Sequence, residues 1–295
     1  MAISAAMVKE LRERTGSGMM ECKKALVETG GDIEAAIELM RKTGQAKAAK
    51  KAGRTAAEGV VMIALDEGHR RGLMVEVNCE TDFVAKDGGF IEFAEAVAAR
   101  ALDGDANDVE DLLGQPVTAD ALQSLAEARE MLIAKVGENI QVRRLARIAS
   151  TEGQLHSYRH GTRIGVLVDL VGGDAELGKD IAMHIAASRP LCVSAEEVDE
   201  ALLAKEREIF RAQALEEGKP EKIVDKIVEG RVRKYLEEVT LLWQPFVKDT
   251  DTTVEQRLTQ ANARVAGFLR VEVGEGIEKR QDNFADEVMA QVRGT

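Results

Sequence analysis

The amino-acid sequence predicts an α+β fold whose centre is a duplicated, antiparallel β-β-α-α-β unit. The first observation behind this prediction is a change of hydrophobic period. Residues 73–79 alternate between two faces, as a strand in a sheet does. From Phe90 onward the period is helical, because Phe93, Ala94 and Val97 follow at spacings of three, four and seven residues. The chain therefore passes from a strand into a helix through a short connection that belongs to neither pattern.

The second observation is an internal repeat. Residues 72–77 (Gly-Leu-Met-Val-Glu-Val) resemble residues 165–170 (Gly-Val-Leu-Val-Asp-Leu), 93 residues later. The helical stretch 93–99 resembles 181–187 at an offset of 88 residues. The connection between strand and helix is therefore five residues longer in the first copy, where residues 81–85 lie. Additional loop in one of two related units is more often functional or neutral than core-forming.

Thr81, Asp82, Phe83 and Val84 lie in this additional loop. Thr81 is a good N-cap residue, and Asp82 and Phe83 follow it in the turn. Aromatic residues make up only 3% of the chain, so a phenylalanine outside the core pattern needs a reason. The pattern allows two interpretations of Phe83: it is presented to a partner, or it fills a gap in the core.

Residues 4–42 predict three short helices. Glycines end the first two, and Asp32 caps the third. Met19 and Met20 follow a Gly-Ser-Gly turn, where side chains tend to be presented outward. Residues 47–53 are rich in alanine and lysine, so they predict a solvated helical linker, with an RNA contact as the alternative.

Each copy of the repeat has its own predicted elements. The first copy has strands at 59–65 and 72–79, a helix from 90, an acidic connection at 103–117, a helix from Thr118 to Lys135 and a strand at 139–148. The second copy has a hairpin at 154–171, helices at 176–188 and 253–263, and a strand at 266–273.

An insertion interrupts the second copy. Residues 194–217 form an amphipathic helix, and Pro220 restarts a second helix after Gly218. Two helices of about 20 residues each predict an antiparallel hairpin roughly 30 Å long. Such a protrusion is usually a contact surface, although it can also cap the second core. Residues 282–293 predict one last short helix.

The charge of the chain is uneven. The net charge of −12 argues against nucleic acid as the main partner. Residues 1–53 nevertheless hold ten Lys and Arg against seven Asp and Glu, a net charge of +3. This basic head can steer a partner or can be a solvated face.

The sequence has no motif of an enzyme or of a membrane protein. It contains no 18-residue apolar run and no basic-then-apolar leader, so we expect a cytoplasmic protein without a membrane span. Cys22, Cys79 and Cys192 are widely spaced and are expected to be reduced thiols. The four histidines lack metal-ligand spacing, and no phosphate-binding glycine loop, GxSxG or HExxH occurs. We therefore expect no metal, no cofactor and no catalytic activity.

Several separate motifs carry a family resemblance. They are residues 14–26 (Arg-Thr-Gly-Ser-Gly-Met-Met-Glu-Cys-Lys-Lys-Ala-Leu), 81–87 (Thr-Asp-Phe-Val-Ala-Lys-Asp), 135–139 (Lys-Val-Gly-Glu-Asn), 157–161 (Ser-Tyr-Arg-His-Gly), 244–247 (Gln-Pro-Phe-Val) and 274–278 (Gly-Glu-Gly-Ile-Glu). In this order they resemble the bacterial elongation factor Ts family, the guanine-nucleotide exchange factors for elongation factor Tu. The resemblance covers essentially the whole chain.

The resemblance implies five parts. They are a ubiquitin-associated-like helical module with its linker (1–53), core subdomain N (54–149), core subdomain C (150–193 and 243–276), an inserted antiparallel coiled-coil hairpin (194–242) and a C-terminal helical module (277–295). Residues 66–71 and 103–117 look lengthened relative to the family pattern, and their role stays open.

The resemblance also implies a function. The chain would bind elongation factor Tu, GDP-bound or nucleotide-free, and promote GDP release by disrupting the site of Mg²⁺ and phosphate. Asp82 would disturb the network around the ion, and Phe83, flanked by Thr81 and Val84, would wedge between partner helices. Further contacts are implied for Met19, Met20 and Lys23 at the GTPase domain, for Val136, Gly137 and Asn139 at a partner helix, for His160 near the site of Phe83, and for Val247 at another partner domain.

Other classes of function stay open at this point. One is an adaptor that binds peptides through residues 1–53 and has no exchange activity. Another is an enzyme with Cys79 as nucleophile, although its place on the apolar face of a strand favours burial. Whether the inserted hairpin forms a homodimer also stays open.

Overall fold

The structure is a computed structural model that describes residues 3–278 of the 295-residue chain. Within this range it contains ten α-helices and eight β-strands. The helices are α1 (Ala5–Thr15), α2 (Met19–Glu28), α3 (Ile33–Lys51), α4 (Gly88–Asp103), α5 (Val109–Gly114), α6 (Leu125–Val136), α7 (Ala175–Ser188), α8 (Glu200–Glu216), α9 (Glu221–Val239) and α10 (Val254–Gln260). The strands are β1 (Glu58–Leu65), β2 (Arg71–Cys79), β3 (Gln141–Ala149), β4 (Gln154–His160), β5 (Ile164–Val171), β6 (Pro245–Phe246), β7 (Asp249–Thr253) and β8 (Arg264–Glu272).

The two larger sheets repeat the same arrangement. One has the order β1-β2-β3 and the other β4-β5-β8, and all their neighbouring strands are antiparallel. Residues 80–87 connect β2 to α4, whereas only residues 172–174 connect β5 to α7. The structure therefore confirms the α+β class and the antiparallel sheets, and it places the five additional residues where the repeat predicts them.

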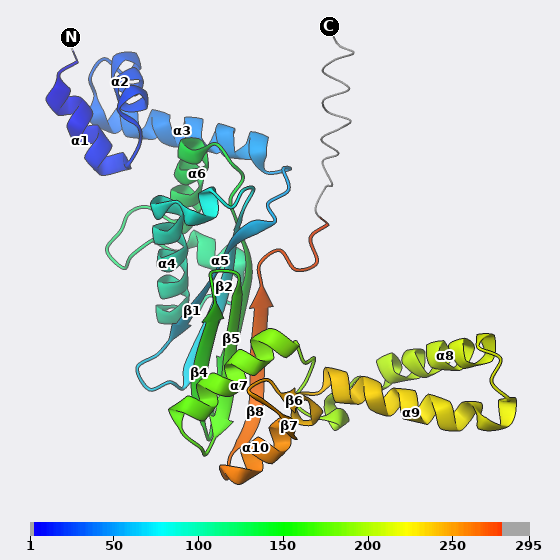
Figure 1. Cartoon of the computed structure of the whole chain (residues 1–295). Helices are drawn as coiled ribbons and strands as arrows, with labels where there is room; N and C mark the ends of the chain where they lie inside the picture. Colours follow the sequence, from blue (N-terminus) through cyan, green and yellow to red (C-terminus); the bar gives the residue numbers. More distant parts are fainter. Residues whose placement is uncertain (1–2, 279–295) are drawn as a thin grey trace, which may run out of the picture.

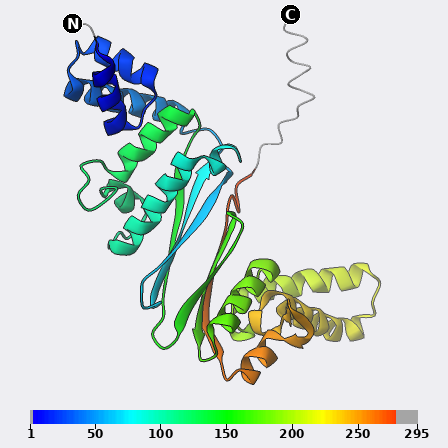
Figure 2. The same ribbon diagram turned by 60° about the vertical axis from the view of Figure 1, so that its left-hand side comes forward.

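The molecule has four layers, because the two sheets pack face to face and helices cover their outer faces (Figure 1, Figure 2). Alternation along the strands produces this arrangement. Val60 in β1 packs with Phe90 of α4, whereas its neighbour Val61 packs with Leu167 of the second sheet. On the far side, the second sheet packs against Ile181 of α7. The central strands β2 and β5 are therefore buried on both faces, whereas the edge strand β4 is largely exposed.

Two features hold the sheets together. A Cβ atom at Gly165 in β5 would lie 2.6 Å from Cγ1 of Val61, so only glycine permits this close approach. Glu76 in β2 is fully buried and accepts a hydrogen bond from the N–H of Gly274, beyond β8 (2.8 Å). Burial alone would raise the pKa of Glu76, but the Gly274 N–H and the Arg144 guanidinium outweigh it and lower that pKa.

The first three helices form a small core of their own around Leu11, Cys22 and Leu26. They join the rest of the chain through α3, which packs along α6 (Figure 1). Ala48 of α3 is buried in the core of the first sheet. The predicted linker is therefore helical as far as Lys51, but it is not solvated on all sides, because alanine on one face contacts the core.

Helices α8 and α9 form the predicted hairpin, which projects from the second core (Figure 1). Its interior contains Ala214, Val224, Val228 and Val232. Larger side chains pack partly buried against this interior, namely those of Leu203, Phe210, Ile227 and Leu236. Ile209 and Ile223 lie outside this interior and are 39% and 45% exposed.

The predicted helix from Thr118 to Lys135 begins too early. Helix α6 starts at Leu125, after Ser124. The Ser124 hydroxyl accepts a hydrogen bond from the Glu127 N–H, and the Glu127 carboxylate accepts one from the Ser124 N–H. This reciprocal capping box satisfies two backbone N–H groups, whereas Thr118 alone would satisfy one, so the helix begins after Ser124.

Two further differences are smaller. The acidic connection at 103–117 contains the short helix α5, which Asp108 caps. Two short strands, β6 and β7, precede α10 and were not predicted. The helix predicted at 282–293 lies outside the described residues.

Candidate functional site

Residues 80–87 form a loop whose second half is tied to the core. The Thr81 hydroxyl accepts a hydrogen bond from the Val84 N–H (3.3 Å) at the start of a single 3₁₀ turn. Ala85, within that turn, is buried. Asp87 then caps α4, because its carboxylate accepts a hydrogen bond from the backbone of the first turn. Asp82 and Phe83 lie between these anchored positions.

Phe83 projects into solvent and is 81% exposed. The interpretation that it fills a gap in the core of this chain is therefore wrong. Val84, its neighbour, packs half-buried against the first core. Fully burying a phenylalanine side chain is worth about 1.5–3 kcal/mol. Phe83 thus leaves an apolar group unburied at a defined place.

Asp82 is also exposed and forms an ion pair with Lys86 one helical turn later (2.7 Å). The hydrogen bond from Lys86 lowers the pKa of Asp82, so its carboxylate is ionised at neutral pH. An exposed pair of this kind contributes little stability. A partner can therefore replace Lys86 at small cost.

The residues around 137 lie beside this loop but differ in accessibility. Val136 packs half-buried on the first core. Gly137 ends α6 in the left-handed conformation (φ 82°), and its carbonyl accepts a hydrogen bond from Lys51. Asn139 is only 2% exposed, and its side-chain amide donates to the carbonyl of Arg54 (2.7 Å). The side chain of Asn139 therefore supports the chain that leaves α3 and does not face solvent.

Met19 and Met20 begin α2 and are 61% and 74% exposed, as the Gly-Ser-Gly turn before them predicts. Lys23 is exposed on the next turn of the same helix. These three side chains form an apolar and basic surface on the N-terminal helices.

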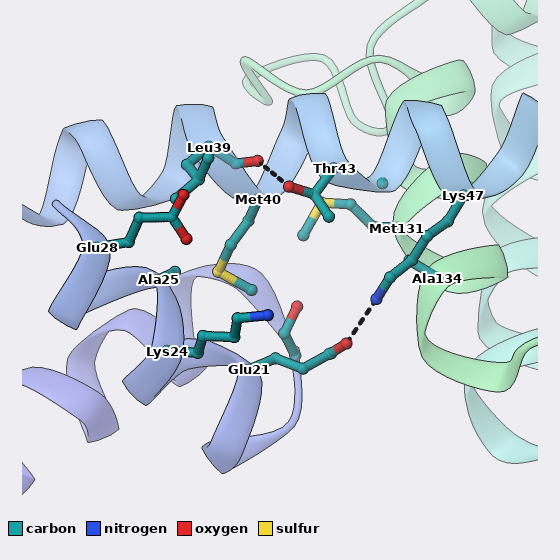
Figure 3. A pocket seen from close by; sticks show the side chains of 12 residues that line it. Glu21, Lys24, Ala25, Glu28, Leu39, Met40, Thr43, Lys47, Met131 and Ala134 are labelled. Atoms are coloured by element: carbon teal, nitrogen blue, oxygen red, sulfur yellow. Dashed lines mark hydrogen bonds and ion pairs between the residues drawn. The ribbon is translucent and has the colours of Figure 1, made fainter.

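A cavity of about 160 Å³ separates α2 from α6 (Figure 3). Lys24 and Met40 point into it, and Met131 of α6 lies on its opposite side (Figure 3). Glu21 of α2 and Lys47 of α3 form an ion pair at one edge (2.8 Å). Helix α2 therefore relies on α3 for its attachment to the core.

His160 and Val247 belong to the second copy of the repeat. His160 is exposed at the end of β4, with Nδ1 3.2 Å from the hydroxyl of Tyr158. Val247 is 42% exposed, and its N–H donates to Nδ1 of His184 (3.1 Å). Burial lowers the pKa of His184, so the ring is neutral and Nδ1 can accept, while Nε2 donates to Gln244 (2.8 Å). Within the described residues, neither His160 nor Val247 hydrogen-bonds to the loop 80–87.

Metal ligands and cysteines were the two kinds of reactive group that the sequence raised. Between residues 3 and 278, no group of three or more His, Cys, Asp or Glu side chains could hold a metal ion. All three cysteines are free. Burial, followed by the negative charge of Glu138, raises the pKa of Cys79 to about 12. Cys79 therefore carries no thiolate at neutral pH, and the interpretation as a nucleophile is wrong.

The same part of the chain contains no helix with the length and apolar character needed to cross a membrane.

Comparison with known proteins identifies the family. A sequence profile described as "Elongation factor TS" matches residues 80–275. The chain is 61% identical to a protein named elongation factor Ts from Methylococcus capsulatus, over 295 residues and the full length of both chains. It is 62% identical to the elongation factor Ts of Thioalkalivibrio sulfidiphilus and 55% identical to that of Alkalilimnicola ehrlichii, again over the full length of both chains. The chain therefore belongs to the elongation factor Ts family.

Proposed function

We propose that this chain binds elongation factor Tu, in its GDP-bound and nucleotide-free forms, and promotes GDP release so that GTP can bind. Membership of the elongation factor Ts family supports elongation factor Tu as the partner. The observation that carries the proposal is the exposure of Asp82 and Phe83 on a loop that the second copy of the repeat lacks. The proposal places the protein in the cytoplasm.

The mechanism follows from how a GTPase holds its nucleotide. Backbone N–H groups cradle the phosphates, and Mg²⁺ is the largest local charge in the site. An ionised Asp82 brought close to the ion would compete for the water and side-chain network around it. The ring of Phe83 would insert between two helices of the partner and would displace the partner's phosphate-binding backbone, which those helices hold in place. Losing the support of Mg²⁺ weakens GDP binding far more than losing one hydrogen bond.

Exchange of this kind is a coupled binding equilibrium and not a catalysed bond change. A factor that loosens GDP must itself be loosened by GDP, because the coupling free energy is reciprocal. The proposed function therefore needs no nucleophile, general base or cofactor in this chain.

The other residues take secondary roles in the proposal. Met19, Met20 and Lys23, on a ubiquitin-associated-like module, would contact the GTPase domain. His160 would contact it near the site of Phe83, and Val247 would contact another domain. Val136 and Gly137 would face a partner helix, whereas buried Asn139 would act as their support. The exposed Ile209, Leu215 and Ile223 give the hairpin the apolar surface that a homodimer would use.

The test is the release of fluorescent GDP from purified elongation factor Tu, with and without this protein. A large acceleration that rises with protein concentration is expected. The alternative, a peptide-binding adaptor, predicts binding to a partner without any acceleration. Binding to elongation factor Tu at an unchanged release rate would therefore contradict the proposal.

A further inference from the structure

The carboxylate of Glu138 joins two loops that are far apart in the sequence. Its Oε2 accepts hydrogen bonds from the N–H groups of Glu80 (3.1 Å) and Thr81 (3.0 Å). Its Oε1 accepts a third from the Thr81 hydroxyl (2.7 Å). All three donors are uncharged, so this is a carboxylate held in place by dipoles and not an ion pair. Such bonds to an ionised acceptor are stronger than those between neutral groups.

Glu80 makes the reciprocal connection. Its Oε1 accepts a hydrogen bond from the Asn139 N–H (2.6 Å), and its carboxylate forms an ion pair with Arg54 (2.9 Å). Asn139 in turn donates to the carbonyl of Arg54. The loop 80–87, the segment 137–139 and the end of the N-terminal linker therefore form one hydrogen-bonded cluster.

The cluster lies where the first sheet ends and the loop 80–87 begins. The ladder between β1 and β2 ends at Cys79, and the ladder between β2 and β3 ends at Asn78. The N–H groups of the next two residues thus lie beyond the sheet, and Glu138 supplies the acceptor that a strand would otherwise provide. Asp82 and Phe83 follow directly. The first half of the loop is fixed by Glu138, and its second half is fixed by the core.

We propose that Glu138 is a positioning residue for nucleotide exchange: by holding residues 80 and 81 it sets the direction in which Asp82 and Phe83 project. The inference rests on the proposed function, since it assigns a role to a residue behind the same loop. Glu138 needs no contact with the partner for this role. Nothing in the hydrophobic pattern of the sequence indicates it, because its hydrogen-bonding partners lie 57 and 58 residues away.

The first experiment compares Glu138→Ala with Glu138→Gln in the release of fluorescent GDP from elongation factor Tu. Glutamine can keep the arrangement, because its carbonyl oxygen can accept from both N–H groups while its amide donates to the Thr81 hydroxyl. Alanine removes all three acceptor contacts. A central contact at an interface is commonly worth about 2 kcal/mol or more, so misplacing Phe83 can cost about tenfold or more. We expect Glu138→Ala to lower the maximal release rate at least tenfold, with a smaller change in the half-saturating concentration, and Glu138→Gln to stay within about threefold of wild type.

Equal defects in the two variants would overturn the inference, because the negative charge of Glu138, and not its hydrogen bonds, would then be required. A defect of Glu138→Ala that saturating protein fully restores would also overturn it, since only docking would be affected. Thermal unfolding of both variants is measured in parallel, and GDP release is assayed well below the lower midpoint, so that unfolding does not contribute to the measured defect.

The second experiment needs no partner. Amide hydrogen exchange is measured by NMR on the full-length free protein. In Glu138→Ala the amides of Glu80 and Thr81 are expected to exchange at least tenfold faster, while Glu138→Gln retains their protection and the amide of Val75 in β2 is unchanged in both. Unchanged protection at residues 80 and 81 in Glu138→Ala would refute the positioning role, whatever the release rates are. If wild type fails to accelerate GDP release, the proposed function fails, and this experiment still decides whether Glu138 holds the loop.

Discussion

Replacing Phe83 with alanine separates a contact residue from a core residue. Phe83 is 81% exposed, so about a fifth of its side chain is buried in the free protein. Full burial of a phenylalanine is worth about 1.5–3 kcal/mol, so Phe83→Ala is expected to cost roughly 0.5 kcal/mol of stability. For a chain of this size that corresponds to a decrease in Tm of about 1–2 °C.

Phe90 provides the matched control, because it is the same residue type and fully buried in the first core. Truncating a buried phenylalanine costs about 3–5 kcal/mol. Phe90→Ala is therefore expected to lower Tm several times more than Phe83→Ala does. Thermal unfolding followed by circular dichroism measures both variants under the same conditions.

In the exchange assay the order of the two variants is expected to be reversed: Phe83→Ala, the more stable variant, is expected to be the more impaired. Phe83→Ala, although folded, is expected to slow GDP release from elongation factor Tu about tenfold or more, because a central apolar contact is commonly worth about 2 kcal/mol or more at an interface. Phe90→Ala, assayed well below its Tm, is expected to be less impaired. A Tm decrease for Phe83→Ala as large as that for Phe90→Ala, or an unimpaired release rate, would refute the reasoning.

Three further predictions concern groups outside the loop. All three cysteines are expected to react with a thiol reagent in denaturant without reductant, and a count below three thiols on fresh protein would contradict the expectation that they are reduced. In the native protein at pH 8, Cys79 is expected to be unreactive, since its pKa is raised to about 12. The pKa of His184 is lower in the folded protein than in the unfolded chain. Near and below about pH 6.5 the unfolded chain therefore binds more protons than the folded protein, and the free energy of unfolding decreases as pH falls below that value. Urea unfolding from pH 7 to 5 is expected to show a shallower pH dependence in His184→Asn than in wild type, and parallel curves would exclude the effect. Glu76→Ala, which leaves its buried donors unpaired, is expected to cost about 3–5 kcal/mol of stability; a loss below about 1 kcal/mol in urea unfolding would show that Glu76 does not hold the sheets together.

Much of the fold is predictable from local pattern. The central strands of the two hairpins are identifiable because both their faces are buried, which gives short, mostly apolar runs between turn residues. The repeat identifies the additional loop because a strand and the helix after it align in both copies, while the connection between them differs in length by five residues. The exposed positions of Met19 and Met20 also agree with expectation, since both follow a turn, and the exposure of Phe83 decides between the two interpretations that the pattern left open.

The parts that could not be predicted depend on contacts between distant residues. Asn139 lies in a recognisable motif, yet only the fold shows that its amide is used by the carbonyls at residues 52 and 54. Glu138 is polar and close to a helix end, and its role appears only when the loop from residue 80 folds against it. The start of α6 is a different case. The Ser124 and Glu127 pair was present in the sequence as a capping-box signature, and it outweighs the isolated Thr118.

The central claim is that Asp82 acts on the magnesium site of the partner. If it does, the effect of removing its carboxylate depends on how firmly Mg²⁺ is held. At millimolar magnesium the ion stabilises bound GDP, so the step that Asp82 assists limits release. With magnesium chelated, that step has already taken place. Phe83→Ala serves as the comparison, because a ring inserted between helices also disturbs the backbone of the partner.

The most direct measurement is therefore GDP release from elongation factor Tu across a magnesium titration, with wild type, Asp82→Ala and Phe83→Ala. Asp82→Ala is expected to be markedly slower than wild type at millimolar magnesium and to converge with it under chelation, whereas Phe83→Ala keeps part of its defect. An Asp82→Ala defect of equal size with and without magnesium would mean that the carboxylate contributes only docking affinity, and it would contradict the proposed mechanism.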